Sequence, residues 1–278
     1  MATITASDVN KLRQMTGAGM MDCKNALVES EGDIEKAIDI LRKKGQKLAV
    51  KRADRNANQG IVLAKTTTDK KFAAVIMLNC ETDFVAKNQE FIEYAHKISD
   101  LAVAAKPASL EALLAMSIDG RNISDGVTDL IGKTGEKMEL AHYEFIEAPL
   151  VIAYNHFGNR LAAILGLNKA DGEGIEEVGK HVAMQIAAMS PVALDKDGVD
   201  SETIAREIEV GKEQARAEGK AEEMLEKIAL GKLNKFYKEN TLLNQEFIND
   251  SKINVREYLQ KADKDLTVSK FYRLQLGV

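Results

Sequence analysis

The chain has 278 residues, of which 45% are hydrophobic and 29% are charged, a composition typical of globular proteins and unlike that of disordered ones. Its net charge of −5 argues against general nucleic-acid binding, because such binding depends on neutralising many phosphates. No apolar stretch approaches the length of about 18 residues that a membrane span requires. The first residues lack the basic and apolar regions of a signal peptide, and Cys23 and Cys80 lie far apart, so we expect a cytoplasmic protein.

Residues 1–44 predict a small domain of three helices. Ser7 or Asp8 can cap the first helix, whose apolar face would comprise Val9, Leu12 and Met15. Asp22 can cap the second helix, and Asp33, which follows a glycine, can cap the third. The positions expected to face inward on the last two helices are Ala26, Leu27, Ile34, Ala37, Ile38 and Leu41.

Residues 45–59 form a basic segment that we interpret as a partly helical linker. It contains Lys47, Lys51, Arg52 and Arg55, followed by a polar stretch that ends in glycine. Contact with RNA is an alternative, but the segment lacks aromatic side chains for base stacking. A solvated linker is therefore favoured, and no direct nucleic-acid binding is expected.

The middle of the chain contains an internal repeat. Residues 60–64 and 72–79 align without a gap on residues 149–153 and 161–168, at a constant offset of 89 positions. Each copy predicts two apolar strands joined by a polar turn. The helical stretches that follow, residues 91–107 and 175–191, align at an offset of 84. The first copy has therefore gained five residues between Asn79 and Phe91.

Two hairpin-and-helix units predict an α+β body in which each sheet has one apolar face to be covered. We expect a first subdomain at residues 60–148, with a further helix at residues 110–114 and a strand at residues 138–146. A strand near residues 143–147 could belong to either sheet. The second subdomain comprises residues 149–192 and 237–278. In its second part the chain packs back onto the body through Phe247 and Ile248 and ends with a strand at residues 270–276.

Residues 193–236 predict an inserted antiparallel helical hairpin. They contain no proline, and Gly219 lies between two helical stripes of apolar residues. The narrow stripes are typical of a coiled coil. These stripes comprise Ile204, Ile208 and Ala215 on one helix, and Leu225, Ile228 or Ala229, Leu233 and Phe236 on the other.

Few residue patterns outside residues 79–90 suggest a binding or catalytic site. Residues 16–19 include a GxG pattern, but no strand precedes it, so a turn between helices is favoured over a phosphate site. Met20 and Met21 follow, and because both cannot face inward, an apolar patch for a partner is an alternative to core packing. The histidines show no metal-ligand spacing, and no nucleophile–base pair is visible. We expect neither an enzyme nor a metal or cofactor site.

The segment of residues 79–90 carries Asp83 and Phe84 side by side, in a protein with few aromatic residues. It should connect a strand to a helix that begins at Phe91. Asp83 could cap that helix, and Phe84 could fold back onto its first turn. The alternative is a protruding aromatic side chain with a neighbouring carboxylate, on the segment where one repeat copy is longer than the other.

Two long motifs resemble those of a known family. Residues 12–27 (LRQMTGAGMMDCKNAL) resemble the N-terminal signature of the bacterial elongation factor Ts family, and residues 79–88 (NCETDFVAKN) resemble its second signature. Residues 231–236 (GKLNKF) are similar to the end of the family's helical hairpin. The resemblance implies a ubiquitin-associated-like N-terminal domain, a core of two subdomains and an inserted coiled-coil hairpin.

The resemblance also implies a function. Family members are guanine nucleotide exchange factors for the GTPase elongation factor Tu in translation elongation, which they meet in its GDP-bound and nucleotide-free states. The implied residues for dislocating the partner's magnesium ion are Thr82, Asp83, Phe84 and Val85, with Phe84 as the wedge. The implied partner contacts are Arg13, Met20, Met21 and His156. The competing hypothesis is a non-catalytic adaptor that holds two partners through the N-terminal helices and the hairpin; self-association through the hairpin stays open.

Overall fold

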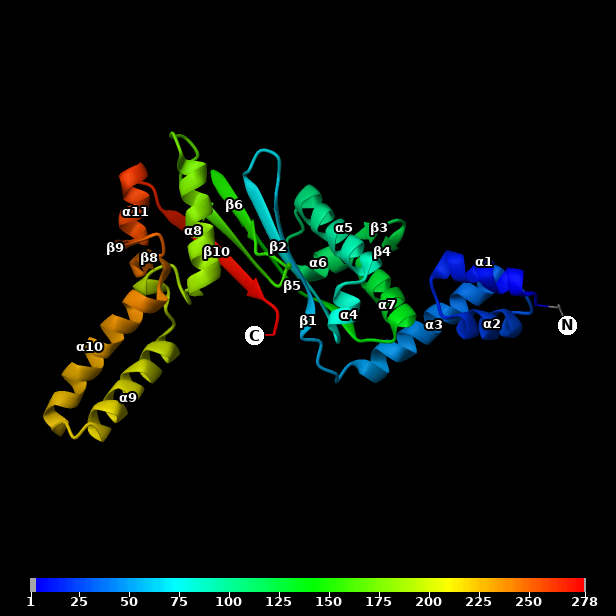
Figure 1. Cartoon of the computed structure of the whole chain (residues 1–278), viewed down its shortest axis with the longest axis horizontal. Coiled ribbons are helices and arrows are strands. Elements are labelled where there is room, and N and C mark those ends of the chain that lie inside the picture. The colour runs from blue at the N-terminus through cyan, green and yellow to red at the C-terminus, as the bar shows by residue number, and fades with distance from the viewer. Residues whose placement is uncertain (1–3, 278) are drawn as a thin grey trace.

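The computed structural model describes residues 4–277 of an α+β protein (Figure 1). Residues 1–3 of the predicted N-terminal domain and residue 278 of the predicted second subdomain lie outside that range. Two sheets occupy the middle of the molecule, with three N-terminal helices at one end and a long helical hairpin at the other (Figure 1). None of the helices within residues 4–277 is both long enough and apolar enough to cross a membrane.

The first three helices are α1 (Ala6–Thr16), α2 (Met20–Glu29) and α3 (Ile34–Arg52). Thr5, rather than Ser7 or Asp8, caps α1, because its hydroxyl accepts from the Asp8 N–H while the Asp8 carboxylate accepts from the Thr5 N–H. Gly19, rather than Asp22, is the N-cap of α2. Asp33 caps α3 as predicted. The small core that the helices share comprises Val9, Leu12, Ala18, Cys23, Ala26, Leu27 and Ala37.

The prediction that Met15 faces this core is wrong, since more than half of its side chain is exposed. Val9, Leu12 and Thr16 follow the i, i+3, i+7 spacing of one helix face, and Met15 lies about 100° away from Thr16 around the axis. The predicted linker is helical as far as Arg52, so α3 continues without interruption through residue 45. A domain boundary at residue 44 therefore does not coincide with the end of a helix.

The internal repeat is present in the structure. The first copy consists of β1 (Gln59–Thr66), β2 (Phe72–Cys80) and α5 (Gln89–Ala105), and the second of β6 (Leu150–Asn155), β7 (Leu161–Leu167) and α8 (Ile175–Met189). Even the left-handed residues correspond: Lys70 and Asn159 in the hairpin turns, and Lys106 and Ser190 at the helix ends. These pairs keep the offsets of 89 and 84 positions, so the two copies share their turn and cap geometry.

The strand order is β1-β2-β5 in one sheet, with β5 at Met138–Glu147, and β10-β7-β6 in the other, with β10 at Val268–Gln275. Residues 143–147 thus belong to the first sheet. The sheets pack face to face, and β2 is buried at every position. The expectation of a single apolar face per sheet is wrong, because helices cover the outer faces while each sheet covers the other's inner face. The shared inner layer includes Val62, Ala64, Val75, Met77, Val151, Ala162 and Ile164.

Between α5 and β5 the chain forms α6 (Leu110–Leu114), β3 (Ser117–Ile118), β4 (Arg121–Asn122) and α7 (Ile123–Thr134). After α8 come η1 (Lys196–Gly198) and the hairpin of α9 (Ser201–Ala217) and α10 (Glu222–Asn240). The hairpin helices begin later and end later than residues 193–236. The last elements before β10 are η2 (Leu242–Asn244), β8 (Glu246–Phe247), β9 (Asp250–Asn254) and α11 (Val255–Ala262).

The two hairpin helices lie very close to each other. A Cβ added to Gly211 of α9 would lie only 3.1 Å from the Ala229 Cα of α10. Lys212 and Glu226 form an ion pair across the helices at 2.7 Å, while Arg216 and Glu222 pair near the turn at 2.8 Å. Small residues at the contact and charges at its edges are typical of narrow helix–helix packing.

Candidate partner-binding site

The segment that connects the first hairpin to its helix contains a helical turn of its own. β2 ends at Cys80, α4 (Asp83–Ala86) follows, and α5 begins at Gln89. Thr82 caps α4 by accepting from the Val85 N–H at 3.4 Å. Asn88, not Asp83, caps α5, because its side-chain oxygen accepts from the Glu90 and Phe91 N–H groups. The capping role considered for Asp83 is therefore excluded.

Phe84 projects from α4 with 82% of its surface exposed. The prediction that Phe84 could fold back onto the first turn of the following helix, α5, is therefore wrong. The next two residues, Val85 and Ala86, are partly buried and pack against the core of the first sheet. The short helix thus anchors one side in the protein and presents an aromatic ring on the other. An exposed, preorganised aromatic side chain is typical of an interface anchor.

Asp83 lies beside Phe84, and its carboxylate accepts from Lys87 Nζ at 2.6 Å. This hydrogen bond and the charge of Lys87 hold the pKa of Asp83 below its usual value. Asp83 is consequently ionised at neutral pH. The exposed end of α4 therefore combines an apolar ring with a negative charge.

Glu81, just before α4, ties this segment to α3. Its carboxylate accepts from Arg52 at 3.2 Å, from Arg55 at 2.9 Å and from the Lys137 N–H at 2.6 Å. Burial alone would raise the pKa of Glu81, but these hydrogen bonds and the arginine charges lower it instead. The ion pairs connect the end of the N-terminal helical unit to the residues that precede Phe84.

The predicted contacts in the N-terminal unit lie on α1 and α2. Arg13 is in the last turn of α1, while Met20 and Met21 are the first two residues of α2. Both methionines are exposed, Met21 at 63%. They form an apolar patch at the start of α2 rather than part of the core. Asp22, which follows Met21, pairs with Lys44 in the middle of α3, and a Cβ on Gly17 would lie 2.9 Å from the Lys133 side chain, so the start of α2 lies beside the end of α7.

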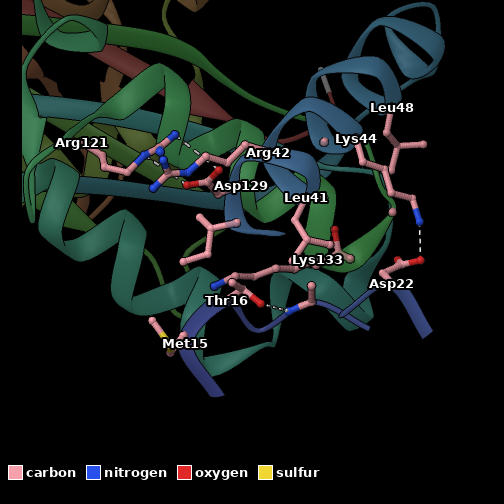
Figure 2. Close-up of a pocket in the computed structure, with 16 residues that line it drawn as sticks. Met15, Thr16, Asp22, Leu41, Arg42, Lys44, Leu48, Arg121, Asp129 and Lys133 are labelled. Atoms are coloured by element: carbon pink, nitrogen blue, oxygen red, sulfur yellow. Dashed lines mark hydrogen bonds and ion pairs between the residues drawn. The ribbon is translucent and has the colours of Figure 1, made fainter. Parts of the chain in front are cut away.

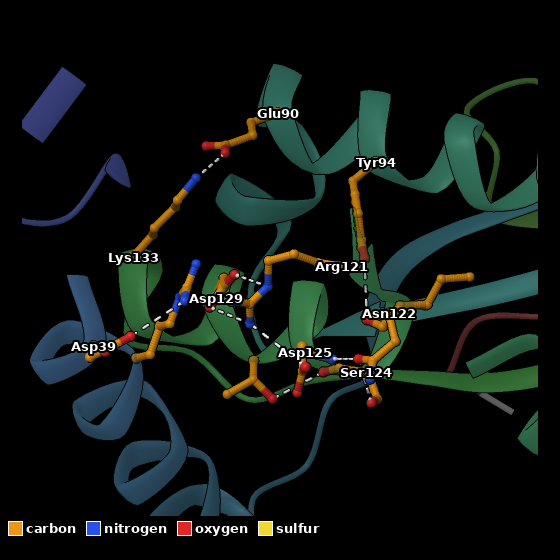
Figure 3. Close-up of polar contacts among 12 residues, drawn as sticks. Asp39, Glu90, Tyr94, Arg121, Asn122, Ser124, Asp125, Asp129 and Lys133 are labelled. Atoms are coloured by element: carbon orange, nitrogen blue, oxygen red, sulfur yellow. Dashed lines mark hydrogen bonds and ion pairs between the residues drawn. The ribbon is translucent and has the colours of Figure 1, made fainter. Parts of the chain in front are cut away.

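A cavity of about 460 Å³ lies between the N-terminal unit and α7 (Figure 2). Its charged side chains are already paired: Arg121 with Asp129 at 3.3 Å, and Lys44 with Asp22. Polar contacts continue around α7, where Lys133 pairs with Glu90 of α5 (Figure 3). Burial raises the pKa of Asp129, and the charge of Arg121 opposes that shift. The paired charges indicate a contact that joins the units rather than a catalytic centre.

Two glycines allow this contact to be close. A Cβ on Gly45 of α3 would lie 3.2 Å from the Thr128 carbonyl oxygen, and one on Gly132 of α7 would lie 3.3 Å from the Gly45 Cα. The helices therefore meet backbone to backbone. This packing sets the position of the N-terminal unit relative to the body.

His156 lies in the turn between β6 and β7, where its Nδ1 is 2.9 Å from the Tyr154 hydroxyl. Its neighbour Phe157 is 98% exposed. Phe157 is not among the contact residues predicted from the sequence; the signal that could have identified it is an aromatic residue inside a polar hairpin turn. The turn is fixed to β1, because Asn159 O accepts from the Val62 N–H at 2.8 Å and Asn155 bonds both backbone groups of Ala64.

The His156 turn and α4 lie at the same end of the two sheets. Gln59, at the start of β1, pairs with Cys80, two residues before Thr82. The same Gln59 accepts from Arg160 at 2.6 Å, just after the His156 turn. The tertiary structure therefore brings two exposed phenylalanines, Phe84 and Phe157, which are 73 positions apart in the chain, to one end of the body.

Two kinds of reactive side chain among the described residues are possible metal ligands and the two thiols. Within residues 4–277 no three His, Cys, Asp or Glu side chains are arranged to hold a metal ion. Cys23 and Cys80 are buried free thiols, and burial raises the pKa of Cys80 to about 12. A thiol with that pKa is protonated at neutral pH and is a weak nucleophile.

Comparison with known proteins places the chain among close relatives. The family model described as "Elongation factor TS" matches residues 81–278. A protein named elongation factor Ts from Cytophaga hutchinsonii is 52% identical over 278 residues, covering all of both chains. The proteins of the same name from Amoebophilus asiaticus and Porphyromonas gingivalis are 51% and 52% identical, with at least 98% of each chain covered.

Proposed function

This chain belongs to the elongation factor Ts family, and we propose that it releases GDP from elongation factor Tu by inserting α4 beside the partner's magnesium ion. It is a guanine nucleotide exchange factor for elongation factor Tu in translation elongation. The observation that carries the proposed mechanism is Phe84, which is exposed at 82% on a helix whose other side is anchored in the core.

The physical requirement for exchange is a coupling between two binding events. The factor and GDP must each weaken the other's hold on elongation factor Tu by the same factor. Each tenfold weakening corresponds to about 1.4 kcal/mol, so emptying a tight nucleotide site requires several such steps. Much of the affinity of such a GTPase for its nucleotide comes from a Mg²⁺ ion held between phosphate oxygens and protein oxygens.

Residues 82–85 have different roles in weakening the partner's hold on GDP and Mg²⁺. Phe84 inserts into the partner and displaces backbone near the metal site, while the ionised Asp83 adds a negative charge and competing hydrogen-bond acceptors there. Thr82 and Val85 cap and anchor the helix that carries them. No step requires this chain to hold the nucleotide or the metal, and no covalent intermediate forms. The chain acts as an exchange factor and not as an enzyme that makes or breaks bonds.

The remaining predicted residues hold the partner. Arg13, Met20 and Met21 contact its nucleotide-binding domain, and His156 provides a contact from the second sheet. The partner is bound in its GDP-bound and nucleotide-free states, in the cytoplasm. The domain organisation predicted for residues 4–277, including the hairpin as an inserted coiled coil that could mediate self-association, is part of this proposal.

The decisive experiment measures the release of fluorescent GDP from elongation factor Tu after a chase with unlabelled GDP, with and without this protein. We expect release to accelerate in proportion to the added factor until it saturates. Unchanged release, together with binding of elongation factor Tu in a pull-down, would favour the adaptor hypothesis instead.

Replacing Met20 and Met21 together with alanine should weaken association without disturbing the wedge. The methionines are exposed, so the change leaves the core of the N-terminal unit intact. We expect the factor concentration for half-maximal GDP release to rise about tenfold, the loss of about 1.4 kcal/mol of contact, with the maximal rate unchanged. Val28→Ala, another exposed change on α2, is the control and should behave as the wild type. A fall in the maximal rate with unchanged half-saturation would contradict this assignment.

Replacing Phe157 with alanine tests the second exposed aromatic residue. The turn that carries it is held by hydrogen bonds to β1, so the backbone around Phe157 is already ordered before a partner binds, which lowers the cost of burying the ring. We expect the dissociation rate of the complex with nucleotide-free elongation factor Tu to rise about fivefold, measured by surface plasmon resonance. Phe157→Tyr, which preserves the ring, should restore most of the affinity. Identical dissociation rates for wild type and Phe157→Ala would exclude the contact.

A further inference from the structure

The helix that carries Phe84 is too short to maintain its own position. α4 has four residues, and isolated helices shorter than about 12 residues are marginal in water. Its orientation must therefore be set by contacts with the rest of the protein. Burial of Val85 and Ala86 provides one of them, but apolar contact alone is not directional. The direction in which Phe84 points requires hydrogen bonds of defined geometry.

Those hydrogen bonds come from Glu136, in the connection between α7 and β5. Its Oε2 accepts from the Thr82 N–H at 3.0 Å, and its Oε1 accepts from the Thr82 hydroxyl at 2.6 Å. One carboxylate thus receives both donors of the residue that caps α4. Hydrogen bonds to an ionised acceptor are shorter and stronger than neutral ones, and two of them fix an orientation.

The hydroxyl contact also determines how Thr82 caps the helix. Because the Thr82 O–H donates to Glu136, its oxygen lone pairs are available to the Val85 N–H, which donates to it at 3.4 Å. The Thr82 carbonyl accepts from the Ala86 N–H at 3.2 Å and from the Cys80 thiol at 3.2 Å. All polar groups of Thr82 are therefore engaged, and the Glu136 carboxylate is the group that comes from outside the segment.

Glu136 itself is held in place. Gly135, in a left-handed conformation, ends α7 and turns the chain toward β5. The Glu136 N–H then donates to the Thr134 hydroxyl at 3.2 Å. On the other side of Thr82, Glu81 is fixed by the Lys137 N–H and by Arg52 and Arg55. The residues around 136 thus hold both residues that precede α4.

We propose that Glu136 is a positioning residue for nucleotide exchange: by accepting both Thr82 donors it fixes α4 so that Phe84 points at the partner. This inference rests on the proposed function of Phe84. In this proposal Glu136 acts through Thr82 and not through a contact of its own with the partner. Its removal changes the direction of the wedge rather than the surface that binds elongation factor Tu.

The test is Glu136→Ala in the fluorescent-GDP release assay, with the full-length protein and the factor concentration varied. We expect the maximal release rate to fall about tenfold while the half-saturating concentration stays within about twofold, because a misdirected group loses rate before it loses binding. Glu136→Gln keeps one acceptor oxygen for the Thr82 N–H and should recover part of the lost rate. A rise in the half-saturating concentration without a change in the maximal rate would overturn the proposal.

A charge control separates the positioning role of Glu136 from a general electrostatic effect. Glu139→Ala removes a negative charge three residues further along the chain, from an exposed side chain that does not bond Thr82, and it should exchange as the wild type does. If it slows exchange as much as Glu136→Ala, the effect is one of charge and the proposal fails. Circular dichroism spectra and melting temperatures of all variants exclude loss of folding as the cause.

A double-mutant cycle with Phe84→Ala distinguishes failure of this inference from failure of the proposed function. If Glu136 acts through Phe84, Glu136→Ala should slow the Phe84→Ala variant by less than about twofold, compared with about tenfold in the wild type. If Glu136→Ala slows release about tenfold in both backgrounds, the effects of the two substitutions are independent. That result would overturn the positioning role of Glu136 without contradicting the role of Phe84. If Phe84→Ala alone exchanges normally, the proposed mechanism itself is wrong.

Discussion

Replacing Phe84 with alanine should slow GDP release from elongation factor Tu by about thirtyfold at saturating factor, the equivalent of the roughly 2 kcal/mol lost at an interface hot spot. The ring is exposed in the free protein, so its deletion removes no internal packing and should leave the melting temperature unchanged. The loss falls on the release rate because the insertion of the ring is coupled to departure of the nucleotide.

Stopped-flow fluorescence with labelled GDP provides the rates for this variant. Val192→Ala, which shortens another well-exposed apolar side chain far along the chain, is the matched control and should match the wild type. Asp83→Asn in parallel separates charge from shape, since it keeps the size of the side chain. Normal exchange by Phe84→Ala would eliminate the wedge mechanism, whatever the result for Asp83.

Replacing Gly60 with alanine should destabilise the two-sheet body by about 4 kcal/mol, the sum of backbone strain and forced overpacking. Gly60 has φ of 142°, and a Cβ there would lie 2.1 Å from the Leu78 carbonyl oxygen. The atom that the added Cβ would strike belongs to the backbone of β2, because Gly60 lies opposite Asn79. A backbone carbonyl in a paired strand cannot rotate away as a side chain could. We expect the variant to unfold at a lower urea concentration than the wild type, with unfolding monitored by circular dichroism.

Gly219→Ala is the matched control for this prediction. Gly219 also has a positive φ, of 75°, but no atom lies within 4 Å of its added Cβ. Only the conformational cost of about 1 kcal/mol applies there. If the two variants lose equal stability, the close approach of β1 and β2 at Gly60 is not what makes glycine necessary.

The sequence by itself determined the local helices and strands, and it showed that two hairpin-and-helix units are copies of one repeat. Apolar periodicity and turn residues located both copies of the repeat, and the structure reproduces even the left-handed residues at equivalent positions, Lys70 with Asn159 and Lys106 with Ser190. The five-residue difference between the copies pointed to the segment that carries Phe84. These features depend on interactions between residues a few positions apart, which a linear pattern records.

Helix boundaries were less well predicted, again for a physical reason. Ser7, Asp8 and Thr5 are all acceptable caps, and the reciprocal bonds between Thr5 and Asp8 decided among them. Likewise α3 extends into the predicted linker as far as Arg52, and its glycine at position 45 packs against Gly132 of α7. Contact with a distant helix outweighs the lower intrinsic helix preference of glycine.

Only the tertiary structure decided how the site is assembled. Glu136 meets Thr82 across 54 positions of the chain, and Phe157 comes to the same end of the body as α4 through the pairing of β1. The two-sided burial of β2 likewise depends on the second sheet. Each of these contacts arises from how sheets and helices stack, and no pattern along the chain specifies that arrangement, because side chains that meet through packing carry no common spacing in sequence.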